Sequence, residues 1–467
     1  MTFNKKILHT LIVLAIMFLA IAGYLTYFQV VKAPALAASG QNPRTLIKEN
    51  VFKRGSIYDR DGVVLAESKK GTDGYERNYP YQDLYSHLIG YTHPKYGRSA
   101  LESEFNSYLS GGTALGSVFN VWDRLAGGEE EGANLTLTIK HSLQKKADEL
   151  LGGRTGSVVA IQPETGEILA LVSNPSFDAN PAYLEKNWDM LSQSEENVLL
   201  PRATMGVYPP GSTFKPIVAT MAVERGMDKE KYNDTGSIII NGKEFKNYKE
   251  KKYDEIALED ALAYSVNTMF ISLADTLGQN SLENVAERFY IGKEIPFDLP
   301  VSKGNILSDS NPGKTDIASI GIGQGDLQVT PMHMALMMAA IANEGVMMRP
   351  FVVYDAKLEN GFSVYKAKTK QLGSVTTSAV SEKVLKMMEK CVTEGTGKNA
   401  KIPGIRVVGK TGTAENEQEK NHAWFVACAI EDEPKIAVSV MLEYDGTSGS
   451  EACVPIAREL IKCYLYD

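Results

Sequence analysis

The chain carries the stretch Tyr208-Pro209-Pro210-Gly211-Ser212-Thr213-Phe214-Lys215-Pro216. Pro216 is compatible with the first turn of a helix, because a proline there removes no helical hydrogen bond. If a helix begins just after Gly211, Ser212 and Lys215 stand three residues apart on one face, and the amine can reach the hydroxyl. Amides at such a helix start also direct partial positive charge toward a developing oxyanion. The stretch therefore predicts a nucleophilic serine activated by a lysine.

Two short motifs follow this stretch in the sequence: Ser265-Val266-Asn267 and Lys410-Thr411-Gly412-Thr413. Acyl transfer needs a nucleophilic hydroxyl, a base, a group that passes a proton to the leaving group, and a cation that recognises the substrate. The three motifs together supply all four. Ser-x-Asn and Lys-Thr-Gly each occur once in the chain, so the ordered set is specific for an acylating serine enzyme.

Ser-x-x-Lys alone is a weak signal, since it also occurs at Ser142 with Lys145 and at Ser363 with Lys366. Ser142 lies in a polar-rich amphipathic segment, 140–150, which predicts a solvent-facing serine near a helix start. Ser363 follows a Glu-Asn-Gly sequence that predicts a turn between strands. Neither copy follows a Pro-Pro-Gly turn, so we expect both to be structural.

On these motifs the chain resembles the penicillin-binding proteins, and most closely the monofunctional class B transpeptidases. The resemblance covers nearly the whole chain and includes further segments at 54–62, 63–66, 156–170, 202–204, 321–325, 330–331 and 422–425. Pro201 departs from the pattern, because the family often has asparagine before that arginine, and we interpret it as a local loop change. The resemblance implies an α+β fold with a five-stranded antiparallel sheet, helices on both faces, and an active site between the sheet edge and the helical part.

The resemblance also implies the catalytic roles. Ser212 would be the nucleophile, and Lys215 the base that deprotonates it, which requires a neutral or proton-sharing lysine. Ser265 would relay a proton to the leaving amine, and Asn267 would hold the substrate amide. The alternative interpretations are a helix-cap serine beside a solvated lysine, and ordinary polar residues within a helix.

Substrate binding is assigned in the same way to the third motif. Lys410 and Thr411 would bind the terminal carboxylate of the donor, and Gly412 would allow close backbone approach. The Thr413 amide would join that of Ser212 in an oxyanion hole. An ordinary strand-end turn is the alternative. Three further residues fit either the site or framework packing: Glu415, His422 and Trp424.

The N-terminus predicts a membrane anchor. Lys5 and Lys6 precede an apolar stretch, 7–31, that is long enough to cross a bilayer once. The lysines favour a cytoplasmic tail at 1–6 and an extracytoplasmic location for the rest of the chain. A cleaved signal peptide is the alternative, because Ala35-Leu36-Ala37 has the small-x-small form of a processing site. We prefer an uncleaved anchor, since signal cores are usually ~7–15 residues long.

Composition is typical of an exported globular enzyme. The 467 residues are 43% hydrophobic and 23% charged, which is enough for two domains behind the anchor. The net charge of −8 argues against nucleic-acid binding, which normally shows a basic surface. We expect a linker at 32–41, a pedestal domain at 42–133 and a transpeptidase domain at 134–467. The pedestal is too small for the glycosyltransferase of bifunctional relatives.

Hydrophobic patterns predict the main elements. In the pedestal we expect strands at 57–58, 63–65 and 90–91 and a helical piece near 101–109. In the larger domain we expect strands at 158–161, 168–172, 407–408, 424–430 and 436–442, with helices at 261–277, 331–343 and 454–464.

No metal or cofactor is expected, because the six histidines show no metal-ligand spacing. The four cysteines include no Cys-x-x-Cys pair, and each lies in an apolar segment. We therefore expect buried thiols, although export would also permit disulfides. The four are Cys391, Cys428, Cys453 and Cys463.

The function implied is a peptidoglycan D,D-transpeptidase, in which a stem peptide ending in D-alanyl-D-alanine acylates Ser212 and β-lactams trap the same serine. A lipid-linked glycan strand polymerase is the implied partner. A β-lactamase would need a deacylating base, and the chain has no Glu-x-x-Leu-Asn. A β-lactam-sensing receptor would usually carry several spans and a cytoplasmic effector. The intact motifs argue against a non-catalytic scaffold, although a scaffolding role can coexist with catalysis. Carboxypeptidase activity and the choice among elongation, division and sporulation stay open.

Overall fold

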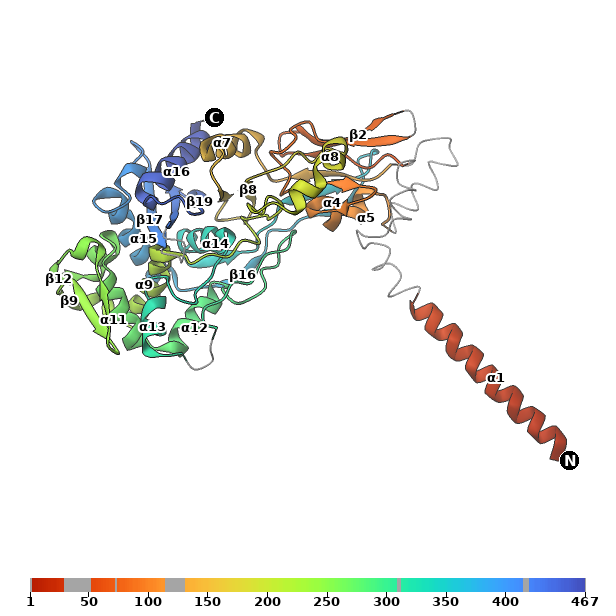
Figure 1. Cartoon of the computed structure of the whole chain (residues 1–467), viewed down its shortest axis with the longest axis horizontal. Helices are drawn as coiled ribbons and strands as arrows, with labels where there is room; N and C mark the ends of the chain where they lie inside the picture. The colour runs from red at the N-terminus through yellow and green to blue at the C-terminus, as the bar shows by residue number, and fades with distance from the viewer. Residues whose placement is uncertain are drawn as a thin grey trace.

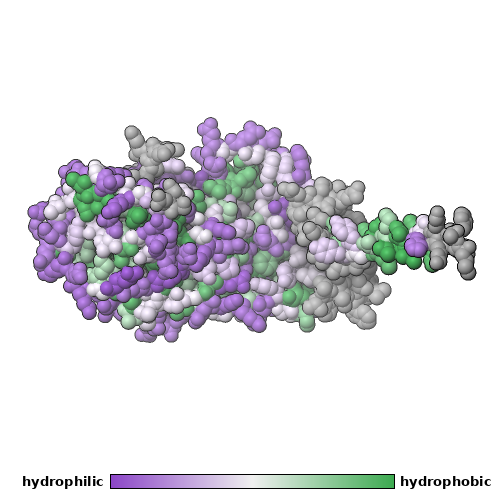
Figure 2. Space-filling model, turned by 90° about the horizontal axis from the view of Figure 1, so that it is seen from below, coloured by the Kyte–Doolittle hydropathy of each residue, from purple (hydrophilic) through white to green (hydrophobic). Residues whose placement is uncertain are grey.

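The computed structural model describes residues 2–28, 52–71, 74–113, 131–308, 312–414 and 420–466. Helix α1 (Thr2–Tyr27) stands apart from the folded body (Figure 1). Its window Leu8–Leu25 has a mean hydropathy of 2.3, and within the described ranges it is the one helix long and apolar enough to cross a membrane. Figure 2 shows apolar residues covering the described part of this helix, whereas the body is mostly polar outside. The predicted linker at 32–41 and the end of the predicted span, 29–31, lie outside the described residues.

A five-stranded sheet forms the centre of the larger part, in the order β17-β18-β19-β7-β8. Every neighbouring pair is antiparallel, which confirms the predicted sheet. The strands are β17 (Arg406–Ala414), β18 (His422–Ile430), β19 (Pro434–Leu442), β7 (Gly156–Ile161) and β8 (Ile168–Asn174). β17 is longer than predicted, because it pairs with β18 along its whole length and brings the Lys-Thr-Gly motif into the sheet.

Helices cover both faces of this sheet, and each face has its own core. Along β18, Trp424 and Val426 pack into one apolar cluster, whereas Phe425 and Ala427 pack into the other, as the alternation of side chains along a strand requires. Helices α7 (His141–Leu151) and α16 (Gly449–Tyr466) cover the second face, and α14 (Pro331–Ala342) packs on the first (Figure 1). All residues of α14 are buried, which explains its almost continuous apolar sequence.

The helical part beside the sheet contains the first two motifs. A 3-10 turn, η2 (Gly211–Phe214), leads directly into α9 (Lys215–Glu224), with Pro216 in the first helical turn as predicted. The prediction of one helix over 261–277 was wrong. The chain forms α10 (Leu258–Ala263) and α11 (Asn267–Leu277), separated by a break at Ser265, whose φ of +61° is incompatible with a right-handed helix. Around them lie α12 (Gln279–Arg288), α13 (Lys314–Ile320) and α15 (Ser378–Thr393).

Two small strand pairs connect α9 to α10. β9 (Lys231–Asp234) pairs with β12 (Asp254–Ala257), and β10 (Ser237–Ile240) pairs with β11 (Lys243–Lys246), both antiparallel. Elsewhere β13 (Val346–Met348) pairs with β16 (Gln371–Ser374), and α8 (Pro181–Ser192) lies near the pedestal. Three of the cysteine side chains are buried thiols, and that of Cys463 is partly buried. The three are Cys391, Cys428 and Cys453.

The pedestal is built on a six-stranded sheet whose strands come from both parts of the chain. Its order is β15-β14-β6-β1-β2-β3, and β6 pairs in parallel with β1 and antiparallel with β14. The sheet therefore crosses the predicted boundary between 133 and 134, and a hairpin from far along the chain extends it. The strands are β1 (Ile57–Tyr58), β2 (Val64–Lys70), β3 (Tyr75–Asn78), β6 (Asn134–Leu137), β14 (Val353–Lys357) and β15 (Ser363–Lys366).

Most predicted pedestal elements are present. The helical piece is divided into α4 (Ala100–Glu104) and α5 (Asn106–Leu109). The strand predicted at 90–91 is misplaced, because the structure has β4 (Thr92–His93), which pairs with β5 (Gly97–Arg98). Gly90 cannot continue a strand, since its φ is +78° and it turns the chain just before β4.

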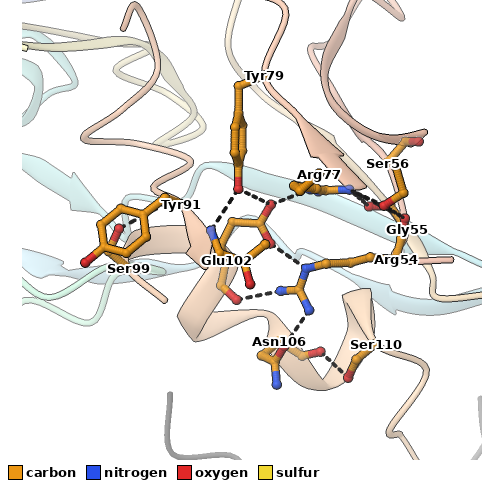
Figure 3. Close-up of polar contacts among 12 residues, drawn as sticks. Arg54, Gly55, Ser56, Arg77, Tyr79, Tyr91, Ser99, Glu102, Asn106 and Ser110 are labelled. Carbon is orange, nitrogen blue, oxygen red and sulfur yellow. Dashed lines mark hydrogen bonds and ion pairs between the residues drawn. The ribbon is translucent and has the colours of Figure 1, made fainter. Parts of the chain in front are cut away.

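A buried ion network holds the pedestal together (Figure 3). The fully buried Glu102 carboxylate accepts from Arg54 Nε at 2.6 Å and from Arg77 Nε at 2.7 Å. Tyr79 and Asn106 complete the network with hydrogen bonds to Glu102 and Arg54. Burial alone would raise the pKa of Glu102, but the two guanidinium groups outweigh burial and hold that pKa below its ordinary value. The arginine of segment 54–62 therefore has a structural role.

Candidate active site

The Pro-Pro-Gly turn leaves Ser212 partly exposed and buries Lys215. Gly211 has a φ of +54°, and a Cβ at this position would lie 2.5 Å from the Thr413 carbonyl oxygen, so only glycine fits. The turn is fixed on its other side by the hydrogen bond from the Gly211 amide to the Gly323 carbonyl, at 2.9 Å. Ser212 is partly exposed, whereas Lys215 is fully buried.

The Lys215 amine contacts the Ser-x-Asn motif. Its Nζ donates to the Ser265 carbonyl oxygen at 2.9 Å and to Asn267 Oδ1 at 2.8 Å, and it lies 3.3 Å from Ser265 Oγ. The first two partners can only accept, whereas a hydroxyl can also donate. A neutral amine has two hydrogens and one lone pair, so the two hydrogens fit the two carbonyl oxygens and the lone pair is left for a hydroxyl proton.

The electrostatic environment favours that neutral state. The pKa of Lys215 lies well below its ordinary value, mainly because the amine is buried and secondly because the charge of Lys410 is near it. The Phe270 ring lies 5.3 Å from Nζ and contributes to the apolar cover of the amine. Lys215 thus has the properties of a general base for a hydroxyl three residues before it.

Ser265 lies between the two motif lysines. Its Oγ is 3.3 Å from Lys215 Nζ and accepts from Lys410 Nζ at 3.0 Å. The φ of +61° is unusual for a residue with a side chain, and such strain persists only where surrounding contacts over-determine it. The break between α10 and α11 is thus what brings this hydroxyl between the two amines, where it can pass protons.

The Lys-Thr-Gly motif occupies the edge strand β17. The Lys410 ammonium is fully buried and donates to the Thr411 carbonyl at 2.9 Å, and Thr411 Oγ1 lies 2.6 Å from Thr396 Oγ1. A Cβ on Gly412 would lie 2.9 Å from the Pro210 carbonyl oxygen, so glycine allows the strand to approach the nucleophile turn. The Thr413 side chain is exposed. The strand β17 and the nucleophile turn therefore lie in close contact.

The other Ser-x-x-Lys copies lie away from this arrangement. Ser142 and Lys145 are exposed on α7, near its start, and Ser363 and Lys366 are exposed on β15, after a turn. Their predicted structural settings are confirmed.

Several supporting residues were missed or left undecided by sequence reasoning. Trp424 Nε1 donates to the Pro209 carbonyl at 3.1 Å, and the Arg202–Glu443 ion pair, at 2.6 Å, supports the segment before the turn. His422 accepts from the Tyr444 amide and so lies in the framework. The segment 415–419, which contains Glu415, lies outside the described residues. These partners are far apart in the sequence, so no local pattern could have identified them.

The charge of Lys410 predicts that the rate constant for acylation falls at alkaline pH. Burial lowers the pKa of the Lys410 ammonium to about 8. Binding of a carboxylate needs this group protonated, so the second-order rate constant for acylation by a β-lactam should fall as the pH rises through about 8. The acid limb should follow protonation of Lys215, below the ordinary lysine value. Stopped-flow acylation of free enzyme measures both limbs.

Lys410→Arg is the matched control for this profile. A guanidinium stays protonated, so its alkaline limb should move to higher pH even if the rate constant is lower throughout. A parent profile that stays flat between about pH 7 and 10 would contradict the assignment.

Comparison with known proteins identifies the family of the chain. The family model for the penicillin binding protein transpeptidase domain matches residues 156–462, and that for the penicillin binding protein A dimerisation domain matches residues 54–135. The chain belongs to the penicillin-binding protein transpeptidase family. It is 30% identical to the peptidoglycan D,D-transpeptidase PbpA of Mycolicibacterium smegmatis, over 99% of this chain and 98% of the relative.

PbpA of Mycobacterium tuberculosis is also 30% identical, over 94% of both chains. The solved structure of penicillin-binding protein A from M. tuberculosis as a penicillin G acyl-enzyme complex has a TM-score of 0.83 and 30% identity, covering 89% of this chain and 100% of that chain. Its imipenem acyl-enzyme complex has a TM-score of 0.84, also at 30% identity, covering 90% and 99%. The whole folded body, pedestal included, is thus similar to class B penicillin-binding proteins.

Proposed function

We propose that the chain is a peptidoglycan D,D-transpeptidase that works through an acyl-enzyme at Ser212. The observation that carries this is the buried, low-pKa Lys215 amine, held by two carbonyl oxygens three residues after a partly exposed serine. Ser212 Oγ attacks the carbonyl carbon of the D-alanyl-D-alanine bond, and its proton passes to the Lys215 lone pair. Collapse of the tetrahedral intermediate breaks the carbon–nitrogen bond and expels D-alanine, whose nitrogen receives a proton through Ser265.

The second half-reaction uses the same groups in reverse. The amine of a neighbouring stem peptide attacks the ester carbonyl, loses a proton to the Ser265–Lys215 pair, and returns Ser212 to the hydroxyl form. The Lys410 ammonium and the Thr411 hydroxyl bind the donor carboxylate, while Asn267 holds the substrate amide. The amides of Ser212 and Thr413 stabilise the oxyanion.

A crosslinking assay tests the proposal directly. Purified protein is incubated with a stem pentapeptide donor and a stem-peptide amine, and mass spectrometry follows the crosslinked product and released D-alanine. We expect both products, and neither with Ser212→Ala. Release of D-alanine without a crosslink would favour a carboxypeptidase. Muropeptide analysis of cells lacking the protein, reporting crosslinks and pentapeptides together, tests the same activity in the wall.

The acyl-enzyme formed with benzylpenicillin should be long-lived. Within the described residues, Lys215 and Ser265 contact amide, carbonyl and hydroxyl groups and a second lysine, and no carboxylate that would activate water. Intact-protein mass spectrometry should therefore show one adduct that persists after free penicillin is removed. Rapid, repeated hydrolysis of benzylpenicillin would instead indicate a β-lactamase.

The anchor and partner follow from the same proposal. Helix α1 would hold the protein in the cytoplasmic membrane as a single span with the body outside, where stem peptides and a lipid-linked glycan strand polymerase are accessible. N-terminal sequencing of protein extracted from membranes tests the anchor, because signal cleavage would leave Ala38 as the first residue. Retention of Lys5 and Lys6 supports the uncleaved anchor.

A further inference from the structure

Helix α11 starts without a cap of its own. Its N-cap residue is Val266, whose side chain has no acceptor, so the first amides of the helix need partners from elsewhere. Asn247 Oδ1 supplies them, because it accepts from the Asn267 amide at 2.8 Å and from the Thr268 amide at 3.1 Å. The start of the helix that carries Asn267 is therefore capped by a residue 20 positions earlier in the chain.

Asn247 is held in turn by a buried carboxylate. Its Nδ2 lies 3.0 Å from both oxygens of Asp234, which is fully buried at the end of β9. Thr268 Oγ1 donates to the same carboxylate at 2.6 Å, and the amides of Gly236 and Tyr253 donate at 3.1 and 2.8 Å. These donors are neutral, so hydrogen bonds stabilise the carboxylate, near the positive end of α11.

These contacts determine which way two amide groups point. A carboxylate can only accept, so Asn247 must turn its NH2 group toward Asp234 and its oxygen toward the helix start. The Lys246 carbonyl accepts from Asn267 Nδ2 at 2.9 Å, which leaves Asn267 Oδ1 directed at Lys215, 2.8 Å away. The segment that bears Asn247 thus fixes both the backbone and the side chain of Asn267.

We propose that Asp234 and Asn247 are positioning residues for the acylation step. Asp234 orients Asn247, Asn247 and its neighbour Lys246 orient Asn267, and Asn267 keeps one Lys215 hydrogen occupied so that the amine lone pair faces the hydroxyls. The inference rests on the function proposed above for Ser212 and Lys215. It adds to that function a buried group, outside the three motifs, on which the rate of proton removal from Ser212 depends.

Asp234→Asn tests this inference against a matched control. The amide keeps the shape but places an NH2 group where donors already converge, so the orientation of Asn247 is lost. We expect the second-order acylation rate constant for benzylpenicillin to fall by on the order of ten- to a hundredfold, while the fraction of protein finally acylated stays unchanged. Asp254→Asn is the control, because Asp254 is opposite Asp234 in the β9–β12 pair but is exposed. It should acylate like the parent.

Two further variants separate positioning from folding. Asn247→Asp should also slow acylation, because it places two carboxylates together, and the double variant Asp234→Asn with Asn247→Asp should recover part of the rate by restoring an amide–carboxylate pair. Thr268→Val removes one hydrogen bond to Asp234 and keeps the side-chain shape, so it should slow acylation severalfold even if Asp234→Asn does not fold.

The outcomes distinguish this inference from the proposed function. A parent-like rate constant in Thr268→Val and in every folded Asp234 or Asn247 variant overturns the inference alone. A reduced acylated fraction at an unchanged rate constant means a merely structural role and also overturns it. A parent protein that is not acylated at Ser212 overturns the proposed function instead.

Discussion

Ser212→Ala should abolish covalent labelling by a fluorescent penicillin and leave the fold intact. Only the attacking oxygen is lost, and the 3-10 turn is fixed by backbone contacts of Gly211 that the substitution does not touch. Lys215→Ala should reduce labelling almost as far, because a serine hydroxyl without its base is a poor nucleophile at neutral pH. Gel fluorescence after a fixed exposure, with circular dichroism as the check on folding, measures both.

The chain supplies the controls for this experiment. Ser142→Ala and Ser363→Ala remove serines that share the Ser-x-x-Lys spacing but lie exposed on α7 and β15. Both should label like the parent. Lys410→Ala should keep labelling but slow it about a hundredfold, since loss of one electrostatic contact costs on the order of 3 kcal/mol. Labelling of a folded Ser212→Ala protein, or its loss in Ser142→Ala, would contradict the assignment.

Glu102→Gln should lower the free energy of unfolding of the pedestal by roughly 3–5 kcal/mol, because it removes the carboxylate charge that both buried guanidinium groups contact. The side chains of Arg54 and Arg77 are 8% and 3% exposed, so water cannot replace the carboxylate. Urea unfolding at neutral pH, followed by tyrosine fluorescence, measures the change. This value is the cost of removing one partner from a buried ion pair. It is not the net contribution of the whole pair to stability, which can be close to zero.

Glu104→Gln provides the comparison, because Glu104 lies on the same helix α4 but is exposed. It should change stability by no more than about 0.5 kcal/mol. The pKa of Glu102 is depressed in the folded state, so its contribution is present above the ordinary carboxylate pKa and is lost as the pH falls through the lowered value. The difference between parent and Glu102→Gln should therefore shrink in acid. A difference independent of pH would argue against the ion network.

The sequence predicted the parts of the molecule that depend on local pattern. Short apolar runs placed the strands of the central sheet, which are buried on both faces. The almost continuous apolar run at 331–343 placed α14. The spacing of Ser212 and Lys215 predicted that the two side chains share one helix face, whereas the contacts of Lys215 with Ser265 and Asn267 were not predicted. That the three motifs form one site was implied by the family resemblance, because motifs so far apart in the sequence meet only through tertiary packing.

Features that depend on distant contacts could not be predicted in the same way. The segment 261–277 has helical periodicity throughout, and the left-handed Ser265 breaks it because contacts with Lys215 and Lys410 determine its position. Asp234 and Asn247 lie in a polar, turn-rich stretch that is typical of an exposed loop, yet both are buried. They are buried because the start of α11 packs against them, and this contact cannot be inferred from the local sequence.

The strands of the pedestal sheet cannot all pair at the same stage of synthesis, because they come from early and late parts of the chain. The Thr138 hydroxyl, next to β6, contacts the Phe351 carbonyl, which is 213 positions later and leads into β14. As the chain is made from its N-terminus, β6 can pair with β1 early, but its other edge waits for a hairpin that emerges only after most of the catalytic part. An unpaired strand edge is a site of wrong association during that interval. The hairpin 353–366 therefore completes the pedestal sheet late, and its pairing with β6 should limit how fast the newly made protein becomes resistant to proteases.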